Sequence, residues 1–138
     1  MKILGLIMVR NGEKKLHATL SAMSAYCDAI YVLNDRSTDN TFAVCKQFPI
    51  VKNVFTADQG LSQQDWFFPE SAMYNLLYRM ADLYRPDWIV QLDDDECITP
   101  GDKVRAVLGA VPPGISCLKF PKVSSWNDPA YPLLVPLM

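Results

Sequence analysis

The 138-residue chain lacks most features that would indicate a nucleic-acid-binding or membrane protein. Its 13 lysines and arginines are outnumbered by 15 aspartates and glutamates, and the net charge is −2. Because no basic excess is present to hold a polyanion, we expect no nucleic-acid partner. Half of the residues are hydrophobic, yet no run approaches the roughly 20 apolar residues of a membrane-spanning helix. We therefore expect one globular domain without a transmembrane segment.

Cysteine and histidine patterns that bind zinc are also missing. The four cysteines are widely spaced, none forms a C-x-x-C pair, and the single histidine is His17, which we expect at the surface. The cysteines are therefore expected to be reduced, mostly buried thiols in a cytoplasmic protein. The apolar residues 3–9 are too few for a secretory signal and run into a polar segment without a small-residue cleavage site. A buried strand is the prediction for them.

Four consecutive acids, Asp93, Asp94, Asp95 and Glu96, follow the apolar run 88–92, which predicts a buried strand. Two carboxylates about 4 Å apart repel by roughly 4 kcal/mol at an effective dielectric near 20, so the cluster must be hydrated, protonated or neutralised by a cation. If the backbone stays extended, Asp93 and Asp95 lie on one side and can share Mg²⁺ or Mn²⁺. The alternative is a solvated acidic turn that caps the next helix. A strand that directs the acids to the edge of a sheet favours the metal site.

Apolar runs alternate with amphipathic segments along the chain. Strands are predicted at 3–9, 29–33, 50–55, 88–92 and 115–120. Helices are predicted at about 12–26, 38–48, 69–84 and 100–110, the first capped by Asn11. This alternation predicts right-handed β–α–β units, and so an α/β fold of three layers with a mainly parallel sheet between helices.

The second predicted strand ends in a polar loop. Ser37 or Thr38 is predicted to cap the helix after it, with Asp39 in the first turn. Capping does not account for Asp35, which is a candidate ligand-binding acid at the strand end. Residues 58–68 have no periodicity and include three aromatic residues, which predicts a loop folded over a site. In the third helix the predicted buried stripe is Met73, Leu76, Leu77, Met80 and Leu83.

Three of these strand ends, residues 9–11, 34–39 and 93–96, together resemble the nucleotide-binding half of the family 2 glycosyltransferases. Members of that family have the GT-A fold, which is Rossmann-like, and an Asp-x-Asp metal motif. The resemblance runs from residue 1 to about residue 100. It implies a GT-A-like fold for this chain, incomplete at the C-terminal end relative to the family.

The resemblance further implies a site for a nucleotide-diphosphate sugar at the C-terminal edge of the sheet. Val9, Arg10 and Asn11 would line the base pocket, and Asp35 would accept hydrogen bonds from the base.

The remaining implied contacts come from the acids and from the third helix. Asp93 and Asp94 would lie near the ribose and phosphates, and Asp95, together with Asp93, would hold Mn²⁺ or Mg²⁺. Asn75 would face the same cleft from the third helix. A cation there would stabilise the charge that develops on the diphosphate leaving group.

The implied activity is transfer of the sugar, with inversion, to a hydroxyl of a glycan, lipid or protein acceptor. Gly12, Asn34 and Arg36 depart from the glutamate, aspartate and glycine that the family often has there. No acid beyond the metal motif fits the general base, so we expect weak or no transfer by these 138 residues alone. A non-catalytic or truncated sugar-nucleotide-binding module is the alternative. The apolar residues 131–138 are expected to pack against a partner. A second copy of the chain is one such partner.

Three rival classes lack a required residue. A phospho-relay receiver domain needs acids after the first strand, where Arg10 and Asn11 stand. A D-x-D-x-T/V phosphatase needs threonine or valine where Cys97 stands. A dinucleotide site needs G-x-G-x-x-G after the first strand, and this motif is absent.

Overall fold

The computed structural model describes residues 1–56, 70–119, 123–124 and 133–134. The strands are β1 Ile3–Val9, β2 Ala29–Asn34, β3 Val51–Thr56, β4 Trp88–Asp93, β5 Val123–Ser124 and β6 Leu133–Leu134. The helices are α1 Leu16–Met23, α2 Thr41–Lys46, α3 Glu70–Tyr84 and α4 Val104–Gly109, with a 3₁₀ turn η1 at Gly101–Lys103.

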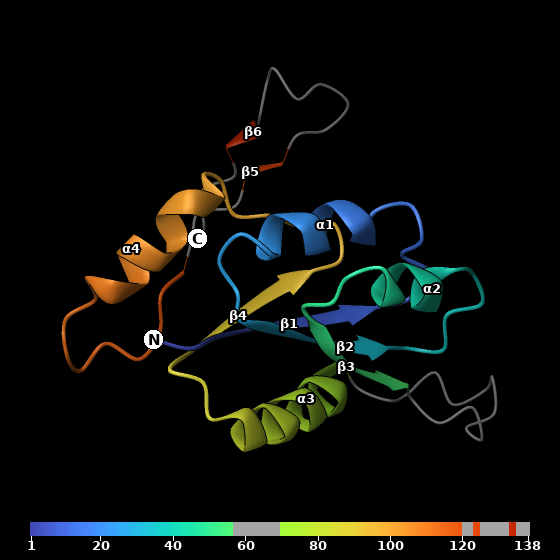
Figure 1. Cartoon of the computed structure of the whole chain (residues 1–138), viewed down its shortest axis with the longest axis horizontal. Coiled ribbons are helices and arrows are strands. Elements are labelled where there is room, and N and C mark those ends of the chain that lie inside the picture. Colours follow the sequence, from blue (N-terminus) through green and yellow to red (C-terminus); the bar gives the residue numbers. More distant parts are fainter. Residues whose placement is uncertain (57–69, 120–122, 125–132, 135–138) are drawn as a thin grey trace.

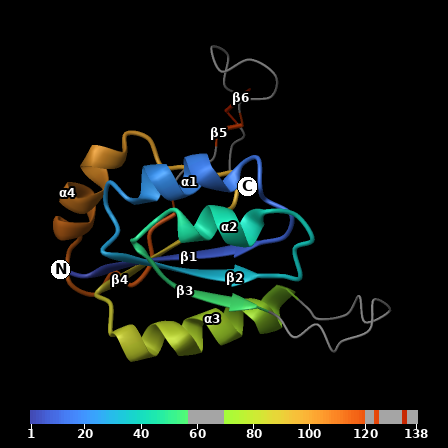
Figure 2. The same ribbon diagram turned by 45° about the vertical axis from the view of Figure 1, so that its right-hand side comes forward.

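The first four strands form one all-parallel sheet in the order β3-β2-β1-β4 (Figure 1). Helices α1 and α2 lie on one face of it, and α3 lies on the other (Figure 2). The predicted α/β fold, with a parallel sheet between two helical layers, is confirmed. The short strands β5 and β6 pair antiparallel with each other.

The core has two parts, one on each face of the sheet. On the α1 face, Leu16 and Leu20 of α1 pack with Ile3, Ile7 and other buried residues. On the α3 face, a second cluster forms around Leu77. Strands β1 and β2 are buried almost throughout, because helices cover them on both faces, whereas the outer strands β3 and β4 are partly exposed.

The predicted buried stripe of α3 is wrong in two places. Met73, Leu77 and Ala81 are buried, whereas Leu76 is 46% and Leu83 80% exposed. The three buried residues recur every four positions and form one row, which rests on β1 and β2. Leu76 and Leu83 lie outside this row, so their apolar character does not bury them.

The predicted fifth strand is also corrected. Residues 115–119 form no strand, Ile115 is 45% exposed, and residue 120 lies outside the described residues. Among the described residues this segment pairs with neither outer strand of the sheet, β3 or β4, and β5 and β6 pair with each other. An apolar run becomes a strand only when it makes hydrogen bonds with a neighbouring strand. The expectations for the loop 58–68 and for most of 131–138 likewise fall outside the described residues.

Several smaller expectations can be checked directly. His17 is exposed, and its ring lies edge-on against Phe48. All four cysteines are free, but two are buried and two, Cys97 and Cys117, are exposed, so the prediction of mostly buried thiols holds for half of them. Within the described ranges, no helix has both the length and the apolar character needed to cross a membrane.

Candidate functional site

The structure brings the three strand ends together at the C-terminal edge of the sheet. Val9 of β1 pairs with Asn34 of β2, and Met8 pairs with Asp93 of β4. The backbone N–H of Asp35 donates to the carbonyl of Val9 at 2.8 Å. Parallel strands with β1 between β2 and β4 therefore place residues 9–11, 34–39 and 93–96 side by side, although up to 87 positions separate them in the sequence.

The loop after β1 is fastened to the loop after β2 by hydrogen bonds. The backbone N–H of Asn11 donates to the Ser37 hydroxyl at 2.9 Å, and the Asn11 side-chain oxygen accepts from the backbone of Thr38 at 2.8 Å. The backbone N–H of Gly12 donates to the buried hydroxyl of Thr41 at 2.9 Å. Asn11 has a φ of 52°, which is not the geometry of a helix cap, and α1 begins only at Leu16. The helix-capping role predicted for Asn11 is therefore wrong.

The start of α2 also differs from the prediction, because the helix begins at Thr41 and its N-cap residue is Asn40, which makes no side-chain capping bond. The carboxylate of Asp39 accepts hydrogen bonds from the backbone N–H of Thr41, at 3.0 Å, and from the Thr41 hydroxyl. The Thr41 hydroxyl, together with weaker contributions from backbone donors, holds the pKa of Asp39 below its ordinary value against the opposing effect of desolvation. Ser37 and Thr38 do not cap because they bond to Asn11.

Asp35 lies at the end of β2, where the sequence predicts it. Its carboxylate accepts a hydrogen bond from Arg36 Nε at 2.8 Å, and the two side chains are 15% and 21% exposed. Arg36 has a φ of 50°, in the left-handed region that favours glycine. A nucleotide base that donates a hydrogen bond to Asp35 would share this carboxylate with Arg36.

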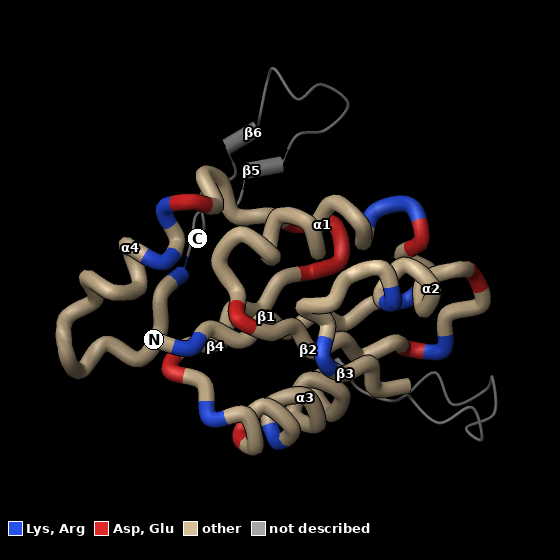
Figure 3. The backbone as a smooth tube through the Cα atoms, in the orientation of Figure 1, with Lys and Arg blue, Asp and Glu red and all other residues tan. Residues whose placement is uncertain are grey.

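The four acids form a turn rather than an extended segment. Strand β4 ends at Asp93, the N–H of Glu96 donates to the carbonyl of Asp93, and the Glu96 carboxylate accepts from the N–H of Asp93 at 3.0 Å. We call residues 93–96 the acid turn; it lies beside α1 (Figure 3).

The turn separates the two acids that an extended backbone would place on one side. Asp93 accepts from the Tyr74 hydroxyl of α3 at 3.4 Å, whereas Asp95 lies 3.2 Å from Lys15 Nζ, next to α1. These helices lie on opposite faces of the sheet (Figure 2). Within the residues that the structure places, no three Asp, Glu, His or Cys side chains are grouped so that they could hold a metal ion by themselves. The extended backbone that the prediction assumed is therefore replaced by a turn, and the metal role of Asp93 and Asp95 stays a prediction.

Asp94 is half-buried against the loop after β1. A methyl group on Gly12 would lie 2.8 Å from Asp94 Oδ2 and 2.4 Å from Val9, so only glycine fits there without a shift. The backbone carbonyl of Asp94 accepts from the Thr19 hydroxyl of α1 at 2.9 Å. Burial, followed by the neighbouring charge of Asp95, raises the pKa of Asp94, and Lys15 opposes this shift.

The other predicted site residues lie near this edge in different environments. Val9 is 2% exposed and belongs to the core, whereas Arg10 and Asn11 are exposed. Asn75 is exposed near the N-terminal end of α3, outside the buried row of that helix.

Sequence reasoning missed three contacts of the acid turn, those made by Lys15, Thr19 and Tyr74. Lys15 and Thr19 are four residues apart, and this spacing on one side of α1 is a signal that the sequence did contain. Both line a cavity of about 250 Å³ between α1 and the acid turn. Its lining consists of Lys15, Ala18, Thr19, Asp95, Glu96 and Cys97.

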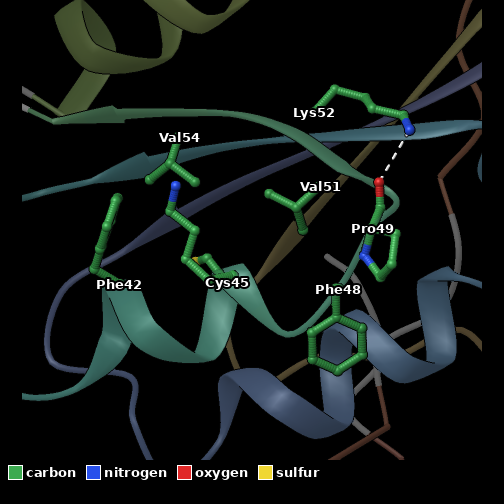
Figure 4. A pocket seen from close by; sticks show the side chains of 8 residues that line it. Phe42, Cys45, Phe48, Pro49, Val51, Lys52 and Val54 are labelled. Atoms are coloured by element: carbon green, nitrogen blue, oxygen red, sulfur yellow. Dashed lines mark hydrogen bonds between the residues drawn. The ribbon is translucent and has the colours of Figure 1, made fainter.

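A second cavity, of about 260 Å³, lies between α2 and β3 (Figure 4). Apolar side chains such as Phe42, Phe48 and Val54 line most of it, and Lys46 and Lys52 contribute the charged groups. None of the predicted site residues lines this cavity, so it is separate from the acid turn.

Comparison with known proteins supports the fold and leaves the activity open. No family model matches the chain. The uncharacterized protein Mb3815c of Mycobacterium bovis and the uncharacterized protein Rv3786c of Mycobacterium tuberculosis are each 44% identical to it over all 138 residues. These residues make up 34% of each of those proteins, so the chain spans about a third of the length of the curated relatives it matches.

The fold is similar to that in a crystal structure of TarS 1-349 from S. aureus, a GT-A-type glycosyltransferase. The TM-score is 0.54, and the similarity covers 78% of this chain and 32% of that one. At 16% identity the likeness concerns the fold alone. The chain therefore has a glycosyltransferase-like α/β fold.

Proposed function

We propose that this chain is the donor-binding part of a glycosyltransferase and binds a nucleotide-diphosphate sugar together with Mn²⁺ or Mg²⁺. The observation that supports this most is the convergence of Asp35, the loop after β1 and the acid turn at one edge of a parallel sheet with a glycosyltransferase-like fold. Open α/β sheets bind their ligands at this edge.

The acid turn suits such a cation by the chemistry of its donors. Carboxylate oxygens are the ligands that Mg²⁺ and Mn²⁺ prefer, and proteins often hold Mg²⁺ through one or two carboxylates while substrate phosphates and water complete the shell. A site without three protein ligands is therefore sufficient when a diphosphate is present. Asp95 is the proposed protein ligand because its side chain is 50% exposed and lies at a cavity.

The other residues bind and orient the donor in this proposal. Asp35 accepts from the nucleotide base, while Asp93 and Asp94 lie toward the ribose and phosphates. Arg10, Asn11 and Asn75 border the nucleotide, and the buried Val9 supports their loop from the core. The bound cation supplies positive charge that stabilises the diphosphate as it leaves. Deprotonation of the acceptor hydroxyl requires a base, which we assign to the rest of a longer protein, and sugar transfer is proposed for that longer protein only.

Titration calorimetry with UDP, GDP and TDP, in Mn²⁺ and in chelator, tests the proposal. We expect one of the three nucleotides to bind the wild type at least about tenfold more weakly in chelator than in Mn²⁺. In Mn²⁺, the same nucleotide should bind Asp95→Asn about tenfold more weakly than it binds the wild type. Asp82→Asn, the same change on the exposed surface near the far end of α3, is the matched control and should bind like the wild type. Equal binding in chelator, or binding of none of the three, would contradict the proposed function.

A further inference from the structure

Lys15 makes a long-range ion pair with the acid turn. Its Nζ lies 3.2 Å from Asp95 Oδ2, although the two residues are 80 positions apart. The charged group reaches the turn because Lys15 immediately precedes α1, whose Thr19 is bonded to the Asp94 carbonyl at 2.9 Å. The anchored helix thus holds a positive charge beside the carboxylate that we assign to the cation.

This ion pair is easy to break. The side chains of Lys15 and Asp95 are 63% and 50% exposed, and exposed pairs of this kind are weak. Lysine also carries a strongly hydrated ammonium group on a flexible stem, so it can leave one partner for another. A cation that binds Asp95 must displace the ammonium group, which then stays within the same cavity.

An ammonium group beside a divalent cation is repelled unless an anion lies between them. The diphosphate of the proposed donor is such an anion, because its oxygens can bind the cation and accept hydrogen bonds from lysine at the same time. We propose that Lys15 is an exchanging counter-ion: it neutralises Asp95 when no cation is bound, and it turns to the donor's diphosphate when the cation takes Asp95. This inference rests on the proposed function and adds to it a phosphate-binding residue that also regulates the cation site.

The exchange predicts opposite effects of one substitution on two ligands. Lys15→Met removes the competing ammonium group, so Mn²⁺ alone should bind about two- to fivefold more tightly. The same variant loses a phosphate contact, so the nucleoside diphosphate in saturating Mn²⁺ should bind about three- to tenfold more weakly. The corresponding nucleoside, which has no phosphate, should bind both proteins equally. Lys15→Arg should preserve nucleoside diphosphate binding.

Lys14→Met is the matched control, because it removes the same charge one residue earlier from another exposed lysine. Calorimetry of the wild type and both variants, with thermal unfolding to show that each is folded, measures the two effects. Opposite shifts for Lys15→Met that Lys14→Met does not show would support the exchange. Equal Mn²⁺ affinities in the two methionine variants, or unchanged diphosphate affinity in Lys15→Met, would overturn it. If the wild type binds no nucleoside diphosphate, the proposed function fails, and the Mn²⁺ comparison alone then decides the counter-ion role of Lys15.

Discussion

Two acidic loops lie at the same edge of the sheet, and their carboxylates have opposite surroundings. In the loop after β2, Asp39 accepts three hydrogen bonds, from the N–H and hydroxyl of Thr41 and from the N–H of Glu13, and its pKa is lowered. In the acid turn, Asp94 is half-buried next to the charge of Asp95, and its pKa is raised. The ionised form is stabilised in the first loop and destabilised in the second.

This difference separates a structural loop from a candidate binding loop. Donors surround Asp39, so its charge helps to fasten the loops after β1 and β2 to each other. The acid turn retains a carboxylate whose charge is poorly compensated, and such groups cluster where a protein binds ligands or catalyses reactions. The variants that follow test this contrast.

The largest effect is expected from Thr41→Val in the structural loop. The Thr41 side chain is fully buried, and its hydroxyl accepts from the N–H of Gly12 at 2.9 Å and donates to Asp39. Valine has a similar shape but leaves that N–H without its partner, so the free energy of unfolding should fall by about 1–3 kcal/mol. Urea denaturation measures the loss. Thr38→Val, which removes an exposed hydroxyl 3.3 Å from Asn11, is the control. Equal losses in the two variants would show that the Thr41 hydroxyl does not fasten the loops.

A smaller effect, of opposite sign, is expected from Asp94→Asn in the acid turn. A carboxyl whose folded-state pKa lies above its ordinary value of 3.8 contributes stability below that pH and loses it as the pH rises through the folded-state value. Wild-type Asp94 therefore destabilises the fold at neutral pH, and asparagine removes this effect. The melting temperature at pH 7 should rise by about 2–4 °C, and the gain should disappear below about pH 3.8.

Asp39→Asn provides the contrast, because its folded-state pKa is lowered. Its stabilising charge is present above the ordinary pKa and is lost as the pH falls, so this variant should melt at a lower temperature than the wild type at pH 7. The two asparagine variants should thus shift the melting temperature in opposite directions. Shifts of the same sign at pH 7 would show that the two loops do not differ as described.

The smallest effect is expected from Tyr74→Phe, which removes the hydroxyl 3.4 Å from Asp93. That hydroxyl is exposed, so the free energy of unfolding should change by no more than about 0.5 kcal/mol. If Tyr74 helps to hold Asp93 near the donor, nucleoside diphosphate affinity should fall by about two- to threefold. Tyr78→Phe removes the hydroxyl that bonds to Gln91, further back along β4, and should leave affinity unchanged. The same affinity in both variants would exclude a positioning role for Tyr74.

The order of the elements and the location of the candidate site were predictable from the sequence. Unbroken apolar runs mark β1 and β2, and polar residues at their ends mark the edge where the loops meet. The prediction failed for α3, where Leu76 and Leu83 are exposed, since the width of a buried stripe depends on what packs against it. It failed again for residues 115–119, because an apolar run is a strand only when it makes hydrogen bonds with a neighbouring strand, and the sequence of the run does not fix that pairing.

The sequence by itself determined the α/β alternation and the gathering of acids at one edge, because hydrophobic periodicity is local and parallel strands share one carboxyl edge. Only the tertiary structure decided which partner each acid has. Asp93 faces Tyr74, Asp94 lies against Gly12, and Asp95 pairs with Lys15. Hydrogen bonds and charge interactions depend on distances in space, and the spacing of residues along the chain does not fix those distances once the backbone turns after Asp93.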